Sequence, residues 1–289
     1  MINDIIKIGF IGAGTVATAL ATSLNIKGFP VTAVSSRSLE SARRLARVIK
    51  DCKPCSNNQE TADNVELVFI TTPDDVIAPV ASQLKWHTGQ YVVHCSGAHS
   101  TEIIESARKA GATVGVFHPL QTFAITSQPT DNIPGTTFTI EADEPLLGIL
   151  KSMATALRGR YIEIKPDDKV IYHTAAVFAC NYLVTLVKIA TDLWQNFGIP
   201  REQAIKALIP ILRGTINNID TIGIPRCLTG PIARGDTGTV SKHLSALQKT
   251  TPNLVSTYRE LGLKTIPIAR AKGKIDDRQA EELEALLIK

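Results

Sequence analysis

Three polar residues each stand at the end of a continuous apolar run, and they are the first candidates for chemistry: Thr72, Ser96 and His118. If the runs are parallel strands, their carboxyl ends meet at one edge of a sheet, where open α/β sheets bind ligands. We therefore expect one site, with Thr72 and Ser96 as hydrogen-bond donors. His118 could donate as well, or act as an acid with a pKa near neutral. The alternative for His118 is a structural histidine hydrogen-bonded to a loop.

Two further polar residues, His173 and Asn181, interrupt a long apolar stretch. On an α-helix they are two turns apart and about 80° apart around the axis, so both could face one cavity. A buried polar side chain costs free energy unless it is paired, which makes both candidates for ligand contact, with hydrogen-bonded core residues as the alternative. In the glycine-rich segment 228–236, Arg234 could bind a substrate carboxylate, or it could pair with Asp236 in a tight turn.

A glycine-rich turn follows directly on the apolar run 5–11 and has the pattern G-x-G-x-x-A. A strand that ends in this pattern and opens a helix is typical of a dinucleotide site, although a turn that serves only packing is the alternative. Gly12 permits the tight turn, Gly14 lets the backbone approach a pyrophosphate, and the helix N-terminus offers free N–H groups. The residues predicted to hold the dinucleotide are Gly12, Ala13, Gly14, Thr15 and Val16, with Thr72, Pro73 and Ser96 on the nicotinamide side.

The next expected strand, 31–34, bears on the choice of cofactor. An NAD site usually carries Asp or Glu about 20 residues after the glycines, whereas an Arg there accommodates the 2′-phosphate of NADP. No carboxylate occupies this position, and the strand ends in hydroxyls and a guanidinium. We therefore predict NADP(H), bound by Ser36, Arg37 and Ser38 through charge-assisted hydrogen bonds. The alternative, which is compatible with this, is that Ser38 caps the next helix and Arg37 is a solvated charge.

The elements that position these residues follow from the periodicity of apolar residues. Strand and helix signals alternate through the first half, which indicates a parallel sheet with helices on both faces. Residues 167–197 contain neither Gly nor Pro, which predicts one helix of about 30 residues. A helix from Pro200 is expected to bend or break near Pro210, and the last helix begins near Asp276 with Gln279 in capping-box position. The sequence thus predicts a Rossmann-type doubly wound α/β domain over residues 1–165 and an all-helical domain over residues 166–289.

The composition narrows the class of protein. A chain of 289 residues with 44% hydrophobic and 20% charged residues is typical of a soluble globular protein with a sizeable core. The net charge of +4 comes without blocks of like charge, which argues against nucleic acid as a partner. Because it contains Asn181 and Lys188, the stretch 174–190 is interpreted as a buried helix and not a membrane span. Strand signals begin almost at Met1, so a cytoplasmic protein is expected, and the long apolar helix predicts a homodimer.

Two of the five cysteines, Cys52 and Cys55, form a C-x-x-C pair. Neither a second cysteine pair nor a histidine pair completes a zinc site, so no metal is predicted. The pair lies where a short third strand is expected, which favours packing, with a redox pair as the alternative.

Several segments together resemble a known superfamily. The glycine turn, the long helix and the segments 117–123 (F-H-P-L-Q-T-F), 173–186 and 228–236 are similar to the 6-phosphogluconate dehydrogenase-like reductases. Within that superfamily they resemble a family that pairs a Rossmann-like domain with its own helical C-terminal domain and is often assigned as NADP oxidoreductases. The resemblance covers nearly the whole chain and implies NADP(H) as cofactor, but it implies little about substrate.

A more distant resemblance is to ketopantoate reductases, which carry a catalytic Lys with substrate-binding Asn residues four and eight positions later. His173 stands at the position of the Lys, Val177 at the first Asn and Asn181 at the second. Only Asn181 matches this pattern, whereas His173 departs from it, although a protonated histidine can perform the same protonation of a developing alkoxide as the Lys.

Taken together, these features predict an NADPH-dependent reductase of a small carbonyl substrate, specifically a 2-keto acid of ketopantoate type. His173 is the expected acid, with His118 as second choice, while Asn181 orients the substrate and Arg234 binds its carboxylate. The alternatives are an imine reductase of pyrroline-5-carboxylate type and a non-catalytic NADP(H)-responsive binding protein.

Overall fold

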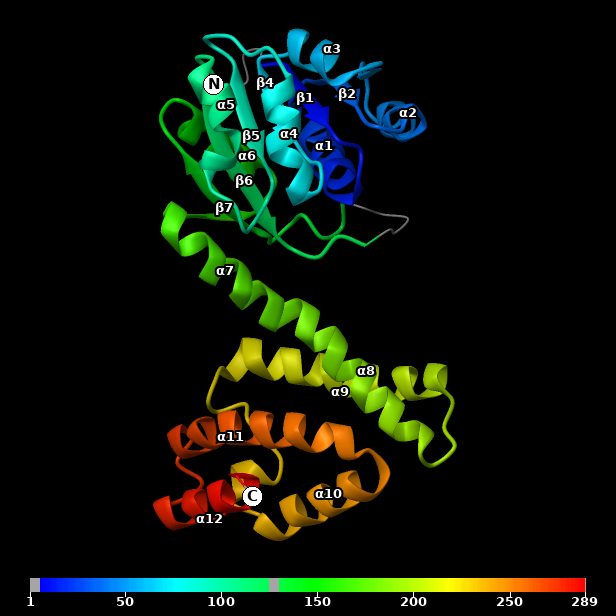
Figure 1. The fold of residues 1–289 in the computed structure, drawn as a ribbon, viewed down its shortest axis with the longest axis vertical. Helices are drawn as coiled ribbons and strands as arrows, with labels where there is room; N and C mark the ends of the chain where they lie inside the picture. Colours follow the sequence, from blue (N-terminus) through cyan, green and yellow to red (C-terminus); the bar gives the residue numbers. More distant parts are fainter. Residues whose placement is uncertain (1–5, 125–129, 289) are drawn as a thin grey trace. The chain divides into compact units, whose positions relative to one another are not determined.

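The computed structural model describes residues 6–124 and 130–288. It divides into two compact units, Met1–Tyr182 and Leu183–Lys289, which are described separately (Figure 1). The predicted α/β domain followed by a helical domain is confirmed at the level of fold class. The boundary predicted at residue 165 lies two residues after the last strand, which ends at Glu163, whereas the chain divides into its compact units after Tyr182, inside the long helix that follows.

An eight-stranded sheet is the centre of the first unit, with the strand order β3-β2-β1-β4-β5-β6-β7-β8. Neighbouring strands are parallel except for β6 and β7, which are antiparallel. The predicted parallel sheet is thus confirmed, and the antiparallel pairing of β6 with β7 was not predicted. Two consecutive strands can pair in parallel only if a crossover connection, usually a helix, joins them. The described part of the connection between β6 and β7 contains no helix. The strands are β1 Ile8–Ile11, β2 Val31–Ser35, β3 Lys53–Pro54, β4 Leu67–Ile70, β5 Tyr91–His94, β6 Thr113–Leu120, β7 Thr137–Ala142 and β8 Arg160–Glu163.

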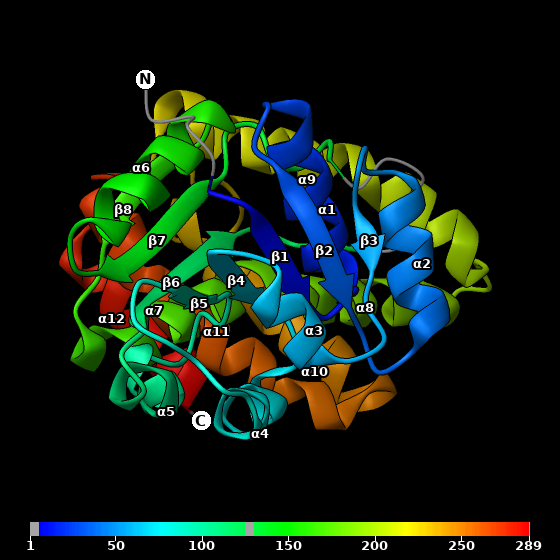
Figure 2. The same cartoon turned by 90° about the horizontal axis from the view of Figure 1, so that it is seen from above.

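Helices cover both faces of this sheet (Figure 2). Leu67 and Phe69 of β4 pack in one apolar cluster and Val68 and Ile70 in the other, because successive side chains of a strand point to opposite faces. The first cluster includes α1 (Thr15–Ile26), α2 (Leu39–Arg47) and α6 (Leu146–Ala156). The second includes α3 (Asn58–Asp63), α4 (Asp74–Gln83), the 3₁₀ turn η1 (Thr101–Ile104) and α5 (Glu105–Lys109).

A continuous helical segment follows the sheet, and it confirms the predicted long helix. It runs from Pro166 to Gln195, which is 30 residues. It begins with the 3₁₀ turn η2 (Pro166–Asp168) and α7 (Lys169–Ala176), passes through a π-helical segment (Val177–Asn181), and continues as α8 (Tyr182–Gln195). The π-helical segment was not predicted, and the 80° separation of His173 and Asn181 calculated for an α-helix does not hold across it.

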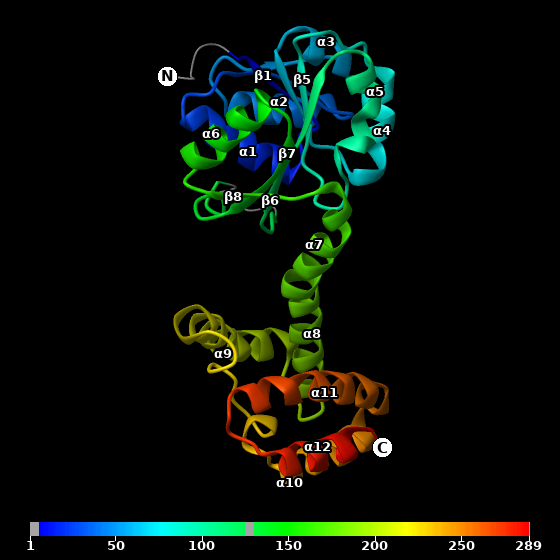
Figure 3. The same cartoon turned by 90° about the vertical axis from the view of Figure 1, so that its left-hand side faces the viewer.

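The second unit is helical (Figure 3). Its core joins apolar side chains of α10, α11 and α12, among them Val240, Leu244, Ile266 and Leu283. At the start of α12, Asp276 Oδ1 accepts from Gln279 N at 2.8 Å and Gln279 Oε1 accepts from Asp276 N at 3.1 Å, which confirms the predicted capping box. Its elements after α8 are α9 (Arg201–Ile222, continuous through Pro210), η4 (Ile232–Arg234), α10 (Thr237–Thr250), η5 (Pro252–Leu254), α11 (Val255–Ala271) and α12 (Asp277–Ile288).

The long helix and α9 expose large apolar side chains. Phe178 is 65% exposed, Val184 68% and Ile211 66%. The helix Pro166–Gln195 is long and apolar enough to cross a membrane by length and composition, and none of its most apolar 18-residue window is buried. The expectation of a buried helix is therefore wrong within this chain, because the described residues leave its apolar face uncovered.

Candidate functional site

The predicted glycine turn is held in place by its neighbours on the sheet. Gly12 has φ +109°, a conformation that favours glycine, and a Cβ there would lie 2.8 Å from the carbonyl oxygen of Thr71. The backbone amide of Thr71 donates to the Ile11 carbonyl at 2.8 Å, and the Thr71 hydroxyl donates to the Gly12 carbonyl at 3.1 Å. Thr71 therefore shapes the turn. Sequence reasoning placed it at a strand end but missed this role.

The N-terminus of α1 can accept an anion. Its N-cap residue Gly14 makes no side-chain capping bond, and the first turn carries no acidic residue. A Cβ on Gly14 would meet nothing within 4 Å among the described residues, so the space above it is open. Free N–H groups beside open space suit a pyrophosphate, and the predicted segment from Gly12 to Val16 thus fits a dinucleotide.

The end of β2 presents the predicted arginine to solvent. Arg37 is exposed, and it forms no ion pair with any described residue. The carboxylate nearest in sequence, Glu40, pairs instead with Arg47 at 3.9 Å. Ser38 Oγ accepts from the Ser41 amide at 3.3 Å, which confirms that Ser38 caps α2. Arg37 remains available to a ligand phosphate, whereas Ser36 is half-buried beside it.

Ser96 is engaged within the protein. It is buried, and its hydroxyl donates to Asp74 Oδ2 at 2.8 Å while accepting weakly from the amides of Ala98 and His99 at 3.3 Å. Asp74 thus binds Ser96 and does not cap α4, whose N-cap is Pro73 without a side-chain bond. In contrast, the buried hydroxyl of Thr72 has no hydrogen-bond partner among the described residues. A ligand carboxamide or oxygen would satisfy Thr72 more readily than Ser96.

Two histidines from distant parts of the sequence approach Gly97. A Cβ on Gly97 would lie 2.8 Å from His118 Nε2 and 3.0 Å from His173 Nδ1, so these two nitrogens are less than 6 Å apart. His118 Nδ1 lies 2.9 Å from the Tyr172 hydroxyl, and the two rings meet edge to face. His173 Nδ1 is buried and has no hydrogen-bond partner among the described residues. Only glycine leaves room for both imidazoles at this point.

Burial is the main influence on the pKa values of His118 and Tyr172. It lowers the pKa of His118 to about 4, with the positive charges of Lys169 and His173 acting in the same direction and Asp74 opposing them. Burial also raises the pKa of the Tyr172 hydroxyl. At neutral pH, therefore, His118 is a neutral imidazole beside a protonated phenol.

Lys169, which lies on the same helix as His173, forms a buried ion pair with Glu141. Lys169 is 1% exposed, and its Nζ lies 3.4 Å from Glu141 Oε2 without forming a hydrogen bond within the described structure. The other carboxylate oxygen of Glu141 accepts from the Thr101 amide at 2.9 Å and hydroxyl at 2.7 Å. Burial lowers the pKa of Lys169, and it lowers that of the neighbouring His94 to about 4. Sequence reasoning missed Lys169, although its i, i+3, i+4 spacing from Tyr172 and His173 places all three on one helix face.

Two predicted residues remain, Asn181 and Arg234. Asn181 ends the π-helical segment and is exposed. In the second unit, Asp236 caps α10 by accepting from the amide and hydroxyl of Thr239, and within the described residues it forms no ion pair with Arg234. Arg234 lines a hollow of about 390 Å³ together with Lys272 and Lys274. No acidic side chain belongs to the described lining, so this hollow favours anions.

Cys52 and Cys55 flank the two-residue strand β3, where a third strand was predicted, and both thiols are free. Burial, followed by the neighbouring Cys55, raises the pKa of Cys52 to about 12. A thiol with so high a pKa is unreactive, which favours packing over redox chemistry. Among the described residues, no group of three or more His, Cys, Asp or Glu side chains could hold a metal ion.

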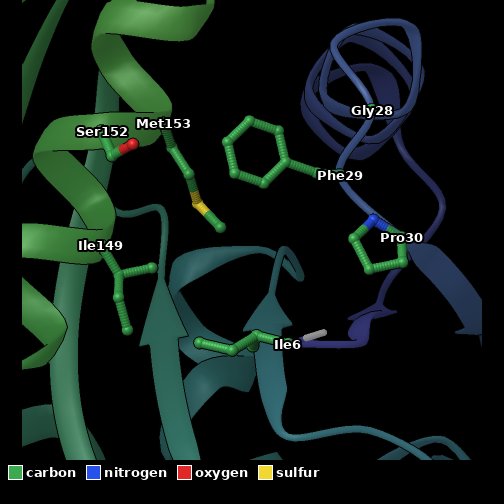
Figure 4. A pocket seen from close by; sticks show the side chains of 7 residues that line it. All are labelled: Ile6, Gly28, Phe29, Pro30, Ile149, Ser152 and Met153. Carbon is green, nitrogen blue, oxygen red and sulfur yellow. The ribbon is translucent and has the colours of Figure 1, made fainter. Parts of the chain in front are cut away.

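A small cavity in the first unit lies away from these residues (Figure 4). It is about 20 Å³, enough for one water molecule. Ile6 and Pro30, which line it, precede β1 and β2, so the cavity lies at the amino ends of the strands. The candidate site is at the carboxyl ends, and this cavity plays no part in it.

Comparison with family models accounts for most of the chain in two parts. Residues 2–119 match a Rossmann-like domain, and residues 136–265 match a domain of unknown function, DUF2520. A comparison with curated protein sequences found no match.

Solved structures of similar fold exist. A Bacteroides fragilis protein assigned as an NADP oxidoreductase has a TM-score of 0.75 at 27% identity, over 92% of this chain and 100% of that one. A Thermotoga maritima protein has a TM-score of 0.72 at 28% identity, over 92% and 99%. A pyrroline carboxylate reductase from Plasmodium falciparum, solved with NADP bound, has a TM-score of 0.59 at 14% identity, over 97% and 98%, and shares the fold alone.

Proposed function

Because the chain joins a Rossmann-like domain to a DUF2520 domain, we propose that it is an NADPH-dependent reductase of a small carbonyl compound. One observation carries the proposal. At the carboxyl edge of the sheet that bears the open glycine turn, His118 and His173 direct ring nitrogens at the same point beside Gly97. A dinucleotide site with an acid–base pair at the same edge is what a carbonyl reductase requires.

NADPH, when bound, supplies the hydride that reduces the carbonyl carbon. The chain's own residues hold the phosphates at the N-terminus of α1, with Arg37 at the 2′-phosphate. His173 is the proposed proton donor to the developing alkoxide, and its buried Nδ1, which lacks a partner within the described structure, is available to contact the substrate oxygen. Neutral His118 donates a hydrogen bond to the same oxygen. Thr72 Oγ1, also buried and unpartnered there, binds the carboxamide.

A 2-keto acid is the proposed substrate class. Its support is the spacing of His173 and Asn181, which is similar to that of ketopantoate reductases. Arg234 is the proposed carboxylate ligand, because within the second unit it lines a hollow with Lys272 and Lys274 that offers donors for an anion. Asn181, on the exposed side of the helix after His173, is the proposed residue that orients the substrate. Imine reduction is the second candidate, because the fold is shared with a pyrroline carboxylate reductase and with a reductive aminase from Aspergillus terreus (TM-score 0.61, 14% identity, over 98% of this chain and 92% of that one).

A homodimer is proposed as the working assembly. The support is the uncovered apolar surface of the long helix and α9, since contiguous apolar patches of this kind mark interaction sites. A second copy of this chain presents the same surface, and isologous contacts of that type are the commonest in oligomers.

The test is NADPH oxidation by the purified protein with a panel of 2-keto acids and cyclic imines. We expect turnover with a member of the first group, and we expect His173→Ala to lower kcat at least about 100-fold while NADPH binding stays within about twofold. The matched control is His87→Gln, which changes an exposed histidine. Turnover only with imines would select the second candidate. Tight NADPH binding without turnover on either panel would overturn the reductase in favour of a binding protein.

A further inference from the structure

Lys169 is the most unusual residue of the first unit that the proposed reaction does not use. Lysine side chains normally keep their ammonium in water by extending along the surface. Lys169 stands at the first position of α7, yet it is among the largest fully buried side chains. Its ammonium has three donors, and none makes a hydrogen bond among the described residues.

Stability alone does not account for this arrangement. Replacing a buried ion pair by apolar residues of similar size is often neutral or stabilising, because desolvating two charges offsets their attraction. Glu141 is held by the Thr101 amide and hydroxyl whether or not Lys169 is present. What Lys169 adds is a positive charge at a defined point, one helical turn from His173 and on the same face as Tyr172.

That charge acts on His118. The charged and titratable groups around the His118 ring are Lys169, Tyr172 and His173 from α7, Asp74 from α4 and His94 from β5. Burial is the main cause of the low pKa of His118. Lys169, followed by His173 and His94, lowers that pKa further, and Asp74 opposes them. Glu141, from β7, is occupied with Lys169 and Thr101.

The hydrogen bond to Tyr172 then selects a tautomer. The phenol keeps its proton, and the His118 Nδ1 atom lies 2.9 Å from the Tyr172 hydroxyl and 3.5 Å from the Thr139 hydroxyl, so it is positioned to accept a hydrogen bond from either. A neutral imidazole that accepts at Nδ1 carries its own hydrogen on Nε2. Nε2 is the atom that faces Gly97 and the partnerless Nδ1 of His173.

We propose that Lys169 is a positioning residue whose buried ammonium, held by Glu141, adds its charge to the burial that keeps His118 neutral, so that His118 donates a hydrogen bond through Nε2 toward the space between Gly97 and His173. The use of that hydrogen bond in catalysis rests on the proposed reductase function. The protonation states themselves do not, and they are measured on the protein without substrate.

The experiment is an NMR titration of the full chain with ¹⁵N-labelled histidine, in which the His118 signals are those lost in His118→Gln. In the wild type at pH 7, long-range ¹H–¹⁵N spectra are expected to show His118 as the neutral Nε2–H tautomer. In Lys169→Met, the midpoint for His118 protonation should rise by about one pH unit, a roughly tenfold larger protonated fraction at a given pH. Lys151→Met is the matched control, since it removes a half-buried lysine that pairs with the exposed Glu163, and should leave His118 unchanged.

Two results would overturn the proposal. One is a His118 midpoint that is the same in the wild type and Lys169→Met. The other is an Nδ1–H tautomer or a charged His118 ring in the wild type at pH 7, which decides the question even if the variant does not fold. The double variant Lys169→Met/Glu141→Gln, which retains the oxygen that Thr101 binds, gives a second measurement of the same rise. Loss of reductase activity is not among the readouts, so failure of the proposed function leaves this test intact.

Discussion

Exchanging each of the two glycines of the turn for alanine separates a structural role from a ligand-binding role. Gly14→Ala places a methyl group in open space, at φ −81° and ψ −169°, where alanine is allowed. The loss of unfolded-state entropy favours the variant by about 0.4–1 kcal/mol, and the poorer N-cap costs about as much. We expect the melting temperature to stay within about 2 °C of the wild type. The methyl group occupies the space proposed for the pyrophosphate, so NADPH affinity should fall at least about tenfold, or about 1.4 kcal/mol.

Gly12→Ala should behave in the opposite way. Its φ of +109° strains any other residue by about 1–3 kcal/mol, and the new Cβ would lie 2.8 Å from a backbone oxygen that cannot rotate away. A total cost of at least about 2 kcal/mol lowers the melting temperature of a unit of this size by about 4–8 °C. Thermal unfolding followed by circular dichroism and NADPH titration by fluorescence measure both quantities. Wild-type NADPH affinity in Gly14→Ala, or an unchanged melting temperature in Gly12→Ala, would refute the assignment of the two glycines.

Two further predictions concern the cofactor and the assembly. Arg37→Gln should weaken NADPH binding about tenfold or more and NADH binding less than twofold, because only NADPH carries the 2′-phosphate. Arg43→Gln, on the exposed side of α2, is the control. Equal losses for both nucleotides would contradict the role of Arg37. Light scattering should give the mass of a dimer for the wild type and of a monomer for the double variant Val184→Glu/Ile211→Glu. The reason is that two charges on the exposed apolar surface oppose its burial in a dimer. A monomeric wild type would contradict the proposed dimer.

Features that depend on neighbouring residues in the sequence were predicted from it, and features that depend on distant ones were not. The capping box of Asp276 and Gln279 and the turn at Gly12 are local, and both were found. The meeting of His118 and His173 at Gly97 depends on the approach of two segments 55 positions apart. Each histidine could be singled out, but not their proximity.

The direction of β7 and the burial of Lys169 could not be predicted from the sequence, for related reasons. The signal for a strand is the same whether it runs parallel or antiparallel, and direction depends on the connection that precedes it. A lysine at the start of a helix is usually a surface residue, so composition gives no reason to single it out. The carboxylate of Glu141, which strand β7 supplies, offsets part of the cost of burying the Lys169 ammonium.

The position of Pro119 has a consequence for association between chains. β5 ends at His94, which pairs with Val116, so the last residues of β6 are hydrogen-bonded on one side only, to β7. An unpaired strand side beside a ligand site is a template on which a strand of another molecule could add, leading to aggregation. Pro119, opposite Phe138, has no N–H to offer such a strand. Pro119 is buried and the next residue, Leu120, is exposed, so the proline next to His118 removes a donor at the point where β6 reaches the surface.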